Sequence, residues 1–73
     1  MTSLRTFKET IEFERQNKFM VFQLKQISAM YYYPEFNRLV ILLAGVQSVS
    51  IIDEIKPFQW ECVQSDWQAA LRR

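Results

Sequence analysis

Residues 27–52, ISAMYYYPEFNRLVILLAGVQSVSII, decide the fold of this 73-residue chain. Proline presets the φ angle of a turn and asparagine tolerates the left-handed region, so residues 34–37 predict a tight turn. Before the turn, residues 27–33 alternate with period two, which is typical of a strand. After it, residues 38–44 are apolar at nearly every position, which indicates a strand covered on both faces. The stretch therefore predicts an antiparallel hairpin whose second strand is central.

The pattern extends on both sides of this hairpin. Gly45 favours a second turn, and residues 46–52 alternate again as a strand. Upstream, residues 19–24 are too densely apolar for a helix surface and predict another strand, with Lys25 and Gln26 as a bend or bulge. The sequence thus predicts a small antiparallel β-meander of three to four strands.

The C-terminal segment has a different period. Trp60, Val63, Trp67 and Leu71 recur at helical spacing, and Pro57 suits the first turn of a helix. This helix is expected to pack on the meander with both tryptophans against the sheet. The fold class is therefore α+β, in one domain over residues 1–73.

The N-terminal residues fit two interpretations. Leu4, Phe7 and Ile11 match the spacing of a short helix. Residues 9–15 instead alternate as a strand, and residues 16–18 resemble a hairpin loop before Phe19. The β propensity of Thr, Ile and Phe slightly favours the strand.

Composition favours association between protein chains over a monomer stabilised by disulfides or a bound metal. The chain has no histidine and one cysteine, so an intramolecular disulfide and the usual zinc spacings are excluded. Aromatic residues make up 15% of a chain with little interior volume, and aromatic side chains are enriched at interface centres. We therefore expect a homodimer, although small domains also expose more apolar surface as monomers.

Charge and hydropathy limit the other partners. The net charge is +1, which gives no general field for nucleic acid. The longest apolar run, residues 39–46, is too short for a membrane span of about 20 residues. No secretory signal is visible before Lys8, and with a lone thiol this favours the cytoplasm.

We expect no catalytic, cofactor or metal site. Without histidine, triads that need an imidazole base cannot form. Cys62 is expected to be a small buried hydrophobe on the helix, not a nucleophile. Glu9, Glu12 and Glu14 are expected to form a solvated face. Gly45 alone cannot build a phosphate loop.

The tyrosine run at 31–33 allows two readings of function. Beside cations, aromatics on a strand can stack bases of single-stranded nucleic acid or a nucleotide, yet neighbouring tyrosines must point to opposite faces. An apolar protein-contact patch fits better, and pairing of exposed strand edges is another route to a dimer. The predicted partner-binding residues are Met30, Tyr32, Phe36, Lys25, Arg38 and Glu35.

The preferred hypothesis is a non-enzymatic protein-interaction module. We expect a small homodimeric regulator or inhibitor that acts by binding another protein. By analogy, such chains are often encoded by phages or mobile elements, for example as inhibitors of a bacterial defence complex. The alternative is a binder of single-stranded nucleic acid or a nucleotide through the tyrosine-rich strand.

Overall fold

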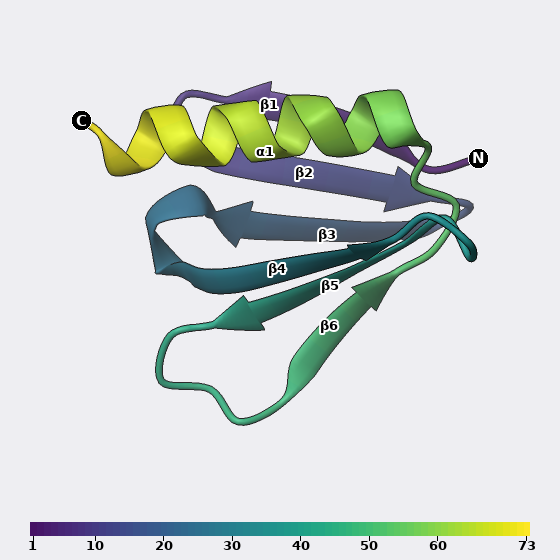
Figure 1. Cartoon of the computed structure of the whole chain (residues 1–73), viewed down its shortest axis with the longest axis horizontal. Coiled ribbons are helices and arrows are strands. Elements are labelled where there is room, and N and C mark those ends of the chain that lie inside the picture. Colours follow the sequence, from purple (N-terminus) through teal and green to yellow (C-terminus); the bar gives the residue numbers. More distant parts are fainter.

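Six strands and one α-helix make up the computed structural model, which describes residues 1–73 (Figure 1). The first antiparallel sheet has the order β1-β2-β3 and the second has the order β4-β5-β6. The strands are β1 (Ser3–Phe7), β2 (Thr10–Arg15), β3 (Lys18–Gln23), β4 (Ile27–Tyr33), β5 (Arg38–Leu43) and β6 (Val49–Ile52). The helix α1 spans Pro57–Leu71. The predicted α+β class and the meander with β5 at its centre are confirmed.

One hydrophobic core joins the two sheets. Side chains alternate between the faces of a strand, and each sheet turns one apolar face inward. In the first sheet Ile11 and Phe13 are fully buried, and the Phe13 ring meets Phe22 edge-on at 5.9 Å. Leu39 and Ile41 are the corresponding fully buried residues of β5. The sheets are thus two halves of one structure with a shared interior.

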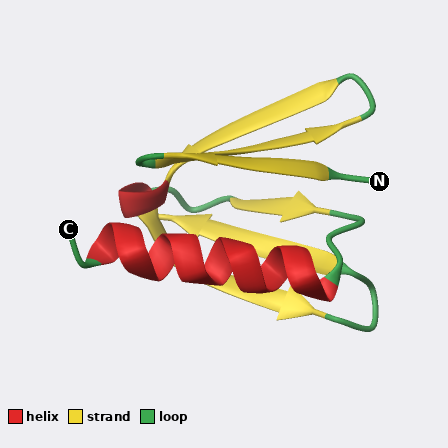
Figure 2. Ribbon diagram, turned by 90° about the horizontal axis from the view of Figure 1, so that it is seen from above, coloured by secondary structure: helices red, strands yellow, loops and turns green.

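The bend predicted at Lys25 and Gln26 is a single 3₁₀ turn, η1 (Leu24–Gln26). Figure 2 shows this turn where the two sheets converge, and the sheets diverge from there. Backbone hydrogen bonds fix it on both sides, since the Leu24 amide donates to the Glu9 carbonyl and the Ala44 amide donates to the Gln26 carbonyl, both at 2.8 Å. Leu24 itself is fully buried, so the bend is also part of the core.

Helix α1 packs along the side of the core where β1 and η1 lie. Pro57 occupies its first turn, and the Gln59 side chain accepts from the Lys56 amide at 2.9 Å. The same Gln59 donates to the Thr2 carbonyl at 2.7 Å, which ties the helix to the start of β1. Trp60 and Trp67 pack against the core as predicted. No helix of the chain is long and apolar enough to cross a membrane.

The structure differs from the sequence expectation at the C-terminal end of the predicted helix stripe. Leu71 is 53% exposed, whereas its neighbour Ala70 is fully buried. Ala70 is seven residues after the buried Val63 and so lies on the same side of the helix, whereas Leu71 is rotated by about 100° from it.

The N-terminal segment is entirely β structure. The predicted strand near residues 9–15 is confirmed as β2, and β1 pairs with it from Ser3↔Glu14 to Phe7↔Thr10. The predicted three-residue loop is shorter, because Lys18 already belongs to β3 and Gln16 adopts a left-handed φ of 57°. β6 is also shorter than predicted, since its strand begins only at Val49 after the turn at Gly45.

Candidate interaction surface

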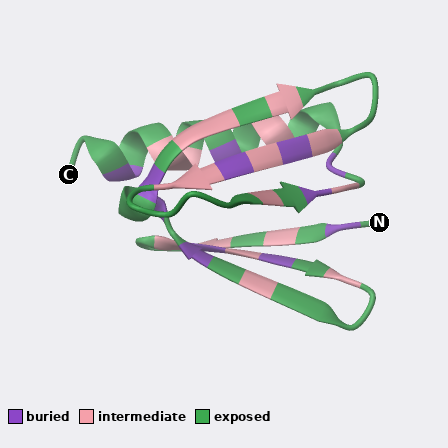
Figure 3. Cartoon of the chain, turned by 90° about the horizontal axis from the view of Figure 1, so that it is seen from below, coloured by how far each residue is buried: buried purple, intermediate pink, exposed green.

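The outer face of the second sheet is apolar on all three strands. The register places Tyr31 beside Val40 and Val40 beside Ile51, and it places Leu42 beside Val49. Tyr31, Tyr33, Val49 and Ile51 each keep about half of their surface exposed, and Figure 3 shows the alternation of burial along these strands. We define the outer apolar face by the following residues, which share this side of the sheet: Ala29, Tyr31, Tyr33, Val40, Leu42, Val49 and Ile51.

One ion pair stands at the end of this face. Arg38 lies opposite Tyr33 in the register, and its Nε donates to Asp53 Oδ1 at 2.7 Å. The Arg38 guanidinium also lies 5.9 Å from the centre of the Phe36 ring, which is 65% exposed in the turn between β4 and β5. The pair neutralises itself, so the outer apolar face carries no net charge.

The structure separates the six predicted partner-binding residues. Met30 and Tyr32 point inward and pack against the core. The Tyr32 hydroxyl donates to the Ile55 carbonyl at 2.8 Å, and its ring stacks on Trp60 at 5.5 Å. Both residues therefore have structural contacts that a partner would have to compete with.

The other four lie at two ends of the second sheet. Glu35, Phe36 and Arg38 are in or next to the turn between β4 and β5. Lys25 is on η1, where its Nζ is 4.0 Å from Glu9. The tyrosines that face solvent are the neighbours of Tyr32, namely Tyr31 and Tyr33, which the predicted set did not contain.

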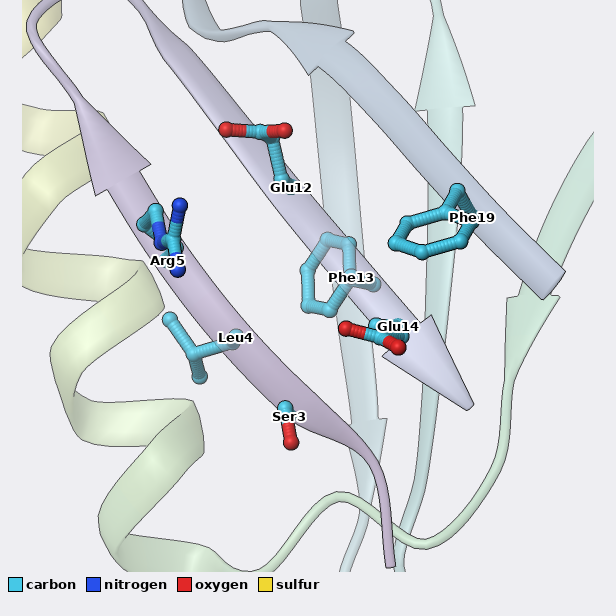
Figure 4. A pocket seen from close by; sticks show the side chains of 7 residues that line it. All are labelled: Ser3, Leu4, Arg5, Glu12, Phe13, Glu14 and Phe19. Atoms are coloured by element: carbon cyan, nitrogen blue, oxygen red, sulfur yellow. The ribbon is translucent and has the colours of Figure 1, made fainter. Parts of the chain in front are cut away.

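The outer face of the first sheet is mixed in character. A hollow of about 180 Å³ lies there, and its lining includes Arg5, Glu12, Glu14 and the exposed Phe19 (Figure 4). Glu9 does not join them, because it lies in the turn between β1 and β2. No group of three or more potential metal-ligating residues occurs in the chain.

A second hollow, of about 510 Å³, lies at the end of the molecule where both sheets meet the loop before α1. Arg15 of β2 donates to Glu54 at 2.7 Å, and the terminal ammonium lies 3.4 Å from the same carboxylate. The hydrogen bond from Arg15, together with its positive charge, lowers the pKa of Glu54. This cluster joins the two sheets electrostatically at their open end.

The expectation that Cys62 is buried is wrong. The side chain is exposed on α1. The buried residues of the helix are Gln59, Val63 and Ala70, and Cys62 is rotated by about 100° from Val63 around the helix. A lone exposed thiol does not define a site.

Comparisons of the chain with protein-family models, with curated proteins and with solved structures return no match. The functional argument therefore depends on the geometry of the chain itself.

Proposed function

We propose that this chain is a non-enzymatic protein-interaction module, a small cytoplasmic homodimer that regulates or inhibits another protein by binding it. The observation that carries the proposal is the outer apolar face. It occupies one whole side of a three-stranded sheet, and apolar patches of this kind on small proteins mark contact surfaces.

The energetics support this assignment. An isolated exposed apolar residue needs no explanation, but on this face apolar side chains are adjacent both along and across the strands. Burying such contiguous surface releases about 25 cal/mol per Å² removed from water. A protein partner would gain this energy without desolvating an unpaired charge, because Arg38 and Asp53 already neutralise each other.

The outer face of the first sheet offers a second contact surface of different chemistry. It combines exposed aromatic and aliphatic side chains, Phe19 and Val21, with the carboxylates of Glu12 and Glu14. In a homodimer joined through the second sheet, this face would remain available on both copies. A regulator of this design, such as an inhibitor of a bacterial defence complex, would hold its target on the first sheet.

The test compares what the chain retains from a native lysate when each outer face is altered. Ile51→Lys changes the second sheet, Val21→Lys changes the first, and Gln64→Lys on the solvent side of α1 is the matched control. We expect a stoichiometric partner that binds the wild type and the control and is lost with at least one outer-face variant. A set of proteins retained equally by all four chains would contradict the proposal.

A second candidate function has one observation in its favour. Tyr31 and Tyr33 project from the same outer face with Arg38 beside them, as in platforms that stack the bases of single-stranded nucleic acid or a nucleotide. However, Arg38 is the one cation beside these two tyrosines, and it is paired with Asp53. Fluorescence anisotropy with a labelled single-stranded oligonucleotide separates the two functions, since tight binding that weakens steeply with salt and with Tyr31→Ala would favour this alternative.

A further inference from the structure

We propose that the outer apolar face is covered by a second copy of this chain, stacked face to face about a twofold axis that runs along β5. The inference rests on the proposed function, because it assigns an occupant to the same face. Two sheets stacked in this way lie about 10 Å apart, with their strand directions within about 30° of each other.

Charge is the first argument for a second copy. The outer apolar face carries no net charge, because its one ion pair, Arg38 with Asp53, is closed at 2.7 Å. A charged partner would lose hydration on this face and find no complementary group, and burying an unpaired charge is costly. A neutral apolar surface of the same size is the matching occupant, and the chain itself has one.

The distribution of side-chain shapes is the second argument. The large rings of the face, Tyr31 and Tyr33, are on β4, whereas β6 carries the branched aliphatic side chains of Val49 and Ile51. A twofold axis along β5 exchanges the two outer strands. Each Tyr31 ring then lies over Ile51 of the second copy, so flat rings meet branched side chains on both sides of the axis.

The central strand fits the same axis. Val40 and Leu42 of β5 would meet their own equivalents, and both are half-buried aliphatic residues. An axis across the strands would instead place Arg38 against Leu42 of the second copy and remove a charge from water. With the axis along β5, Arg38 lies opposite its own equivalent at one end of the face, where each guanidinium is paired with Asp53 of its own chain and is close to the exposed Phe36.

The size of the face sets the affinity. The strands β4, β5 and β6 have seven, six and four residues, and at about 4.8 Å between strands and about 3.3 Å per residue they form a platform of at most roughly 15 by 20 Å. Two such platforms cover roughly 600 Å² in total, which is less than the roughly 1,200 Å² of the smaller stable complexes, so the contact is weak and reversible. We therefore expect a weak monomer–dimer equilibrium that becomes visible only at high protein concentration.

Analytical ultracentrifugation of the full chain from 1 to 300 μM tests the dimer. We expect the wild type to dimerise and both Ile51→Lys and Tyr31→Glu to raise the dissociation constant at least tenfold. Val21→Lys is the matched control, since Val21 is 61% exposed on an edge strand of the other sheet. It should dimerise like the wild type, and circular dichroism should show that all variants are folded.

Mixing the two face variants tests the axis itself. In a heterodimer of the Ile51→Lys chain with the Tyr31→Glu chain, the introduced lysine and glutamate face each other across one side of the axis. We therefore expect the mixture to dimerise more tightly than either variant alone, by about tenfold, with the gain lost in 0.5 M salt.

Three results would overturn the inference: a wild type that stays monomeric at 300 μM, a dimer insensitive to Ile51→Lys, or no gain on mixing. The second would indicate pairing through a strand edge instead. A monomeric chain that still retains a lysate partner would refute the homodimer and leave only the protein-binding part of the proposed function standing. A dimer with no partner on either face would refute the regulatory function but not the interface.

Discussion

The two sheets have the same topology but differ in how many charged residues lie on their outer faces. Each is a three-stranded antiparallel meander, and each contributes fully buried side chains to the common core. On the outside, the first sheet alternates apolar residues with Arg5, Glu12 and Glu14, whereas the second sheet has one ion pair at its end and is otherwise apolar.

The difference shows what the fold itself requires and what it does not. A meander needs one apolar face to pack against the core, and the first sheet meets that need with an outer face on which Arg5, Glu12 and Glu14 interrupt the exposed apolar side chains. The second sheet has the same structural task, so its apolar outer face is additional to what folding requires. An outer face of this kind is best explained by a contact outside the chain.

The largest loss of stability is expected for the fully buried side chains that both sheets contribute to the core. Phe13→Ala in β2 and Ile41→Ala in β5 each remove a fully buried side chain from the shared core. Each should lower the free energy of unfolding by about 3–5 kcal/mol, out of the roughly 4–10 kcal/mol expected for a domain of this size. Urea denaturation followed by tryptophan fluorescence measures both losses.

The matched control for this pair is Glu14→Ala, which alters the outer face of β2 next to Phe13 and should change stability by less than about 0.5 kcal/mol. If only one of the two core variants were strongly destabilising, the sheets would not share one cooperative core.

A smaller loss of stability is expected when a tyrosine hydroxyl is removed from β4, and it should differ between the two faces of this strand. Tyr32→Phe removes the hydroxyl that donates to the Ile55 carbonyl at 2.8 Å, and should cost about 1 kcal/mol. Tyr31→Phe removes a hydroxyl with no protein partner and should cost almost nothing. Thermal unfolding of both variants gives the comparison, and equal losses would show that the two tyrosines do not differ in the way the structure indicates.

The sequence predicted the second sheet and the helix well, because the turn at 34–37, the apolar run after it and the tryptophan spacing are strong local signals. It assigned the faces of β4 incorrectly for a definite reason. Strict alternation from Ile27 puts Tyr31 and Tyr33 on the buried side and Tyr32 on the outside. A β-bulge between Ile27 and Ala29 shifts the register and reverses this assignment.

The outer apolar face could not be predicted from the sequence, because its residues are known only once the position of the bulge is known. The Ser28 side chain donates to the Leu42 carbonyl at 3.2 Å beside it, but a serine within a strand is no signal for a bulge. β1 was equally hard to assign, since Leu4, Phe7 and Ile11 have helical spacing and the predicted strand began only near residue 9. Its pairing with β2 settles the matter through contacts that lie outside the segment.

The smallest change in stability is expected for the Arg15–Glu54 ion pair, which joins the two sheets at their open end. Arg15 of β2 lowers the pKa of Glu54 below its ordinary value of 4.5, chiefly by hydrogen bonding to the carboxylate. A depressed carboxyl pKa adds stability that is fully present above the unfolded value and is lost as the pH falls through the folded value. Glu54→Gln should therefore lower the Tm slightly at pH 7, and the difference from wild type should shrink as the pH drops below 4.5.

Glu35→Gln serves as the control, because this exposed turn carboxylate has no ion-pair partner in the structure, and it should show no such trend. Since the Arg15–Glu54 pair is exposed to solvent, 0.5 M salt should also reduce the effect. A Tm difference that stays constant from pH 7 to pH 3 would mean that Glu54 acts through the shape of the loop and not through its charge. The ion pair would then contribute nothing to joining the two sheets at this end, where the buried Thr2 hydroxyl also donates to the Asp53 carbonyl at 2.5 Å.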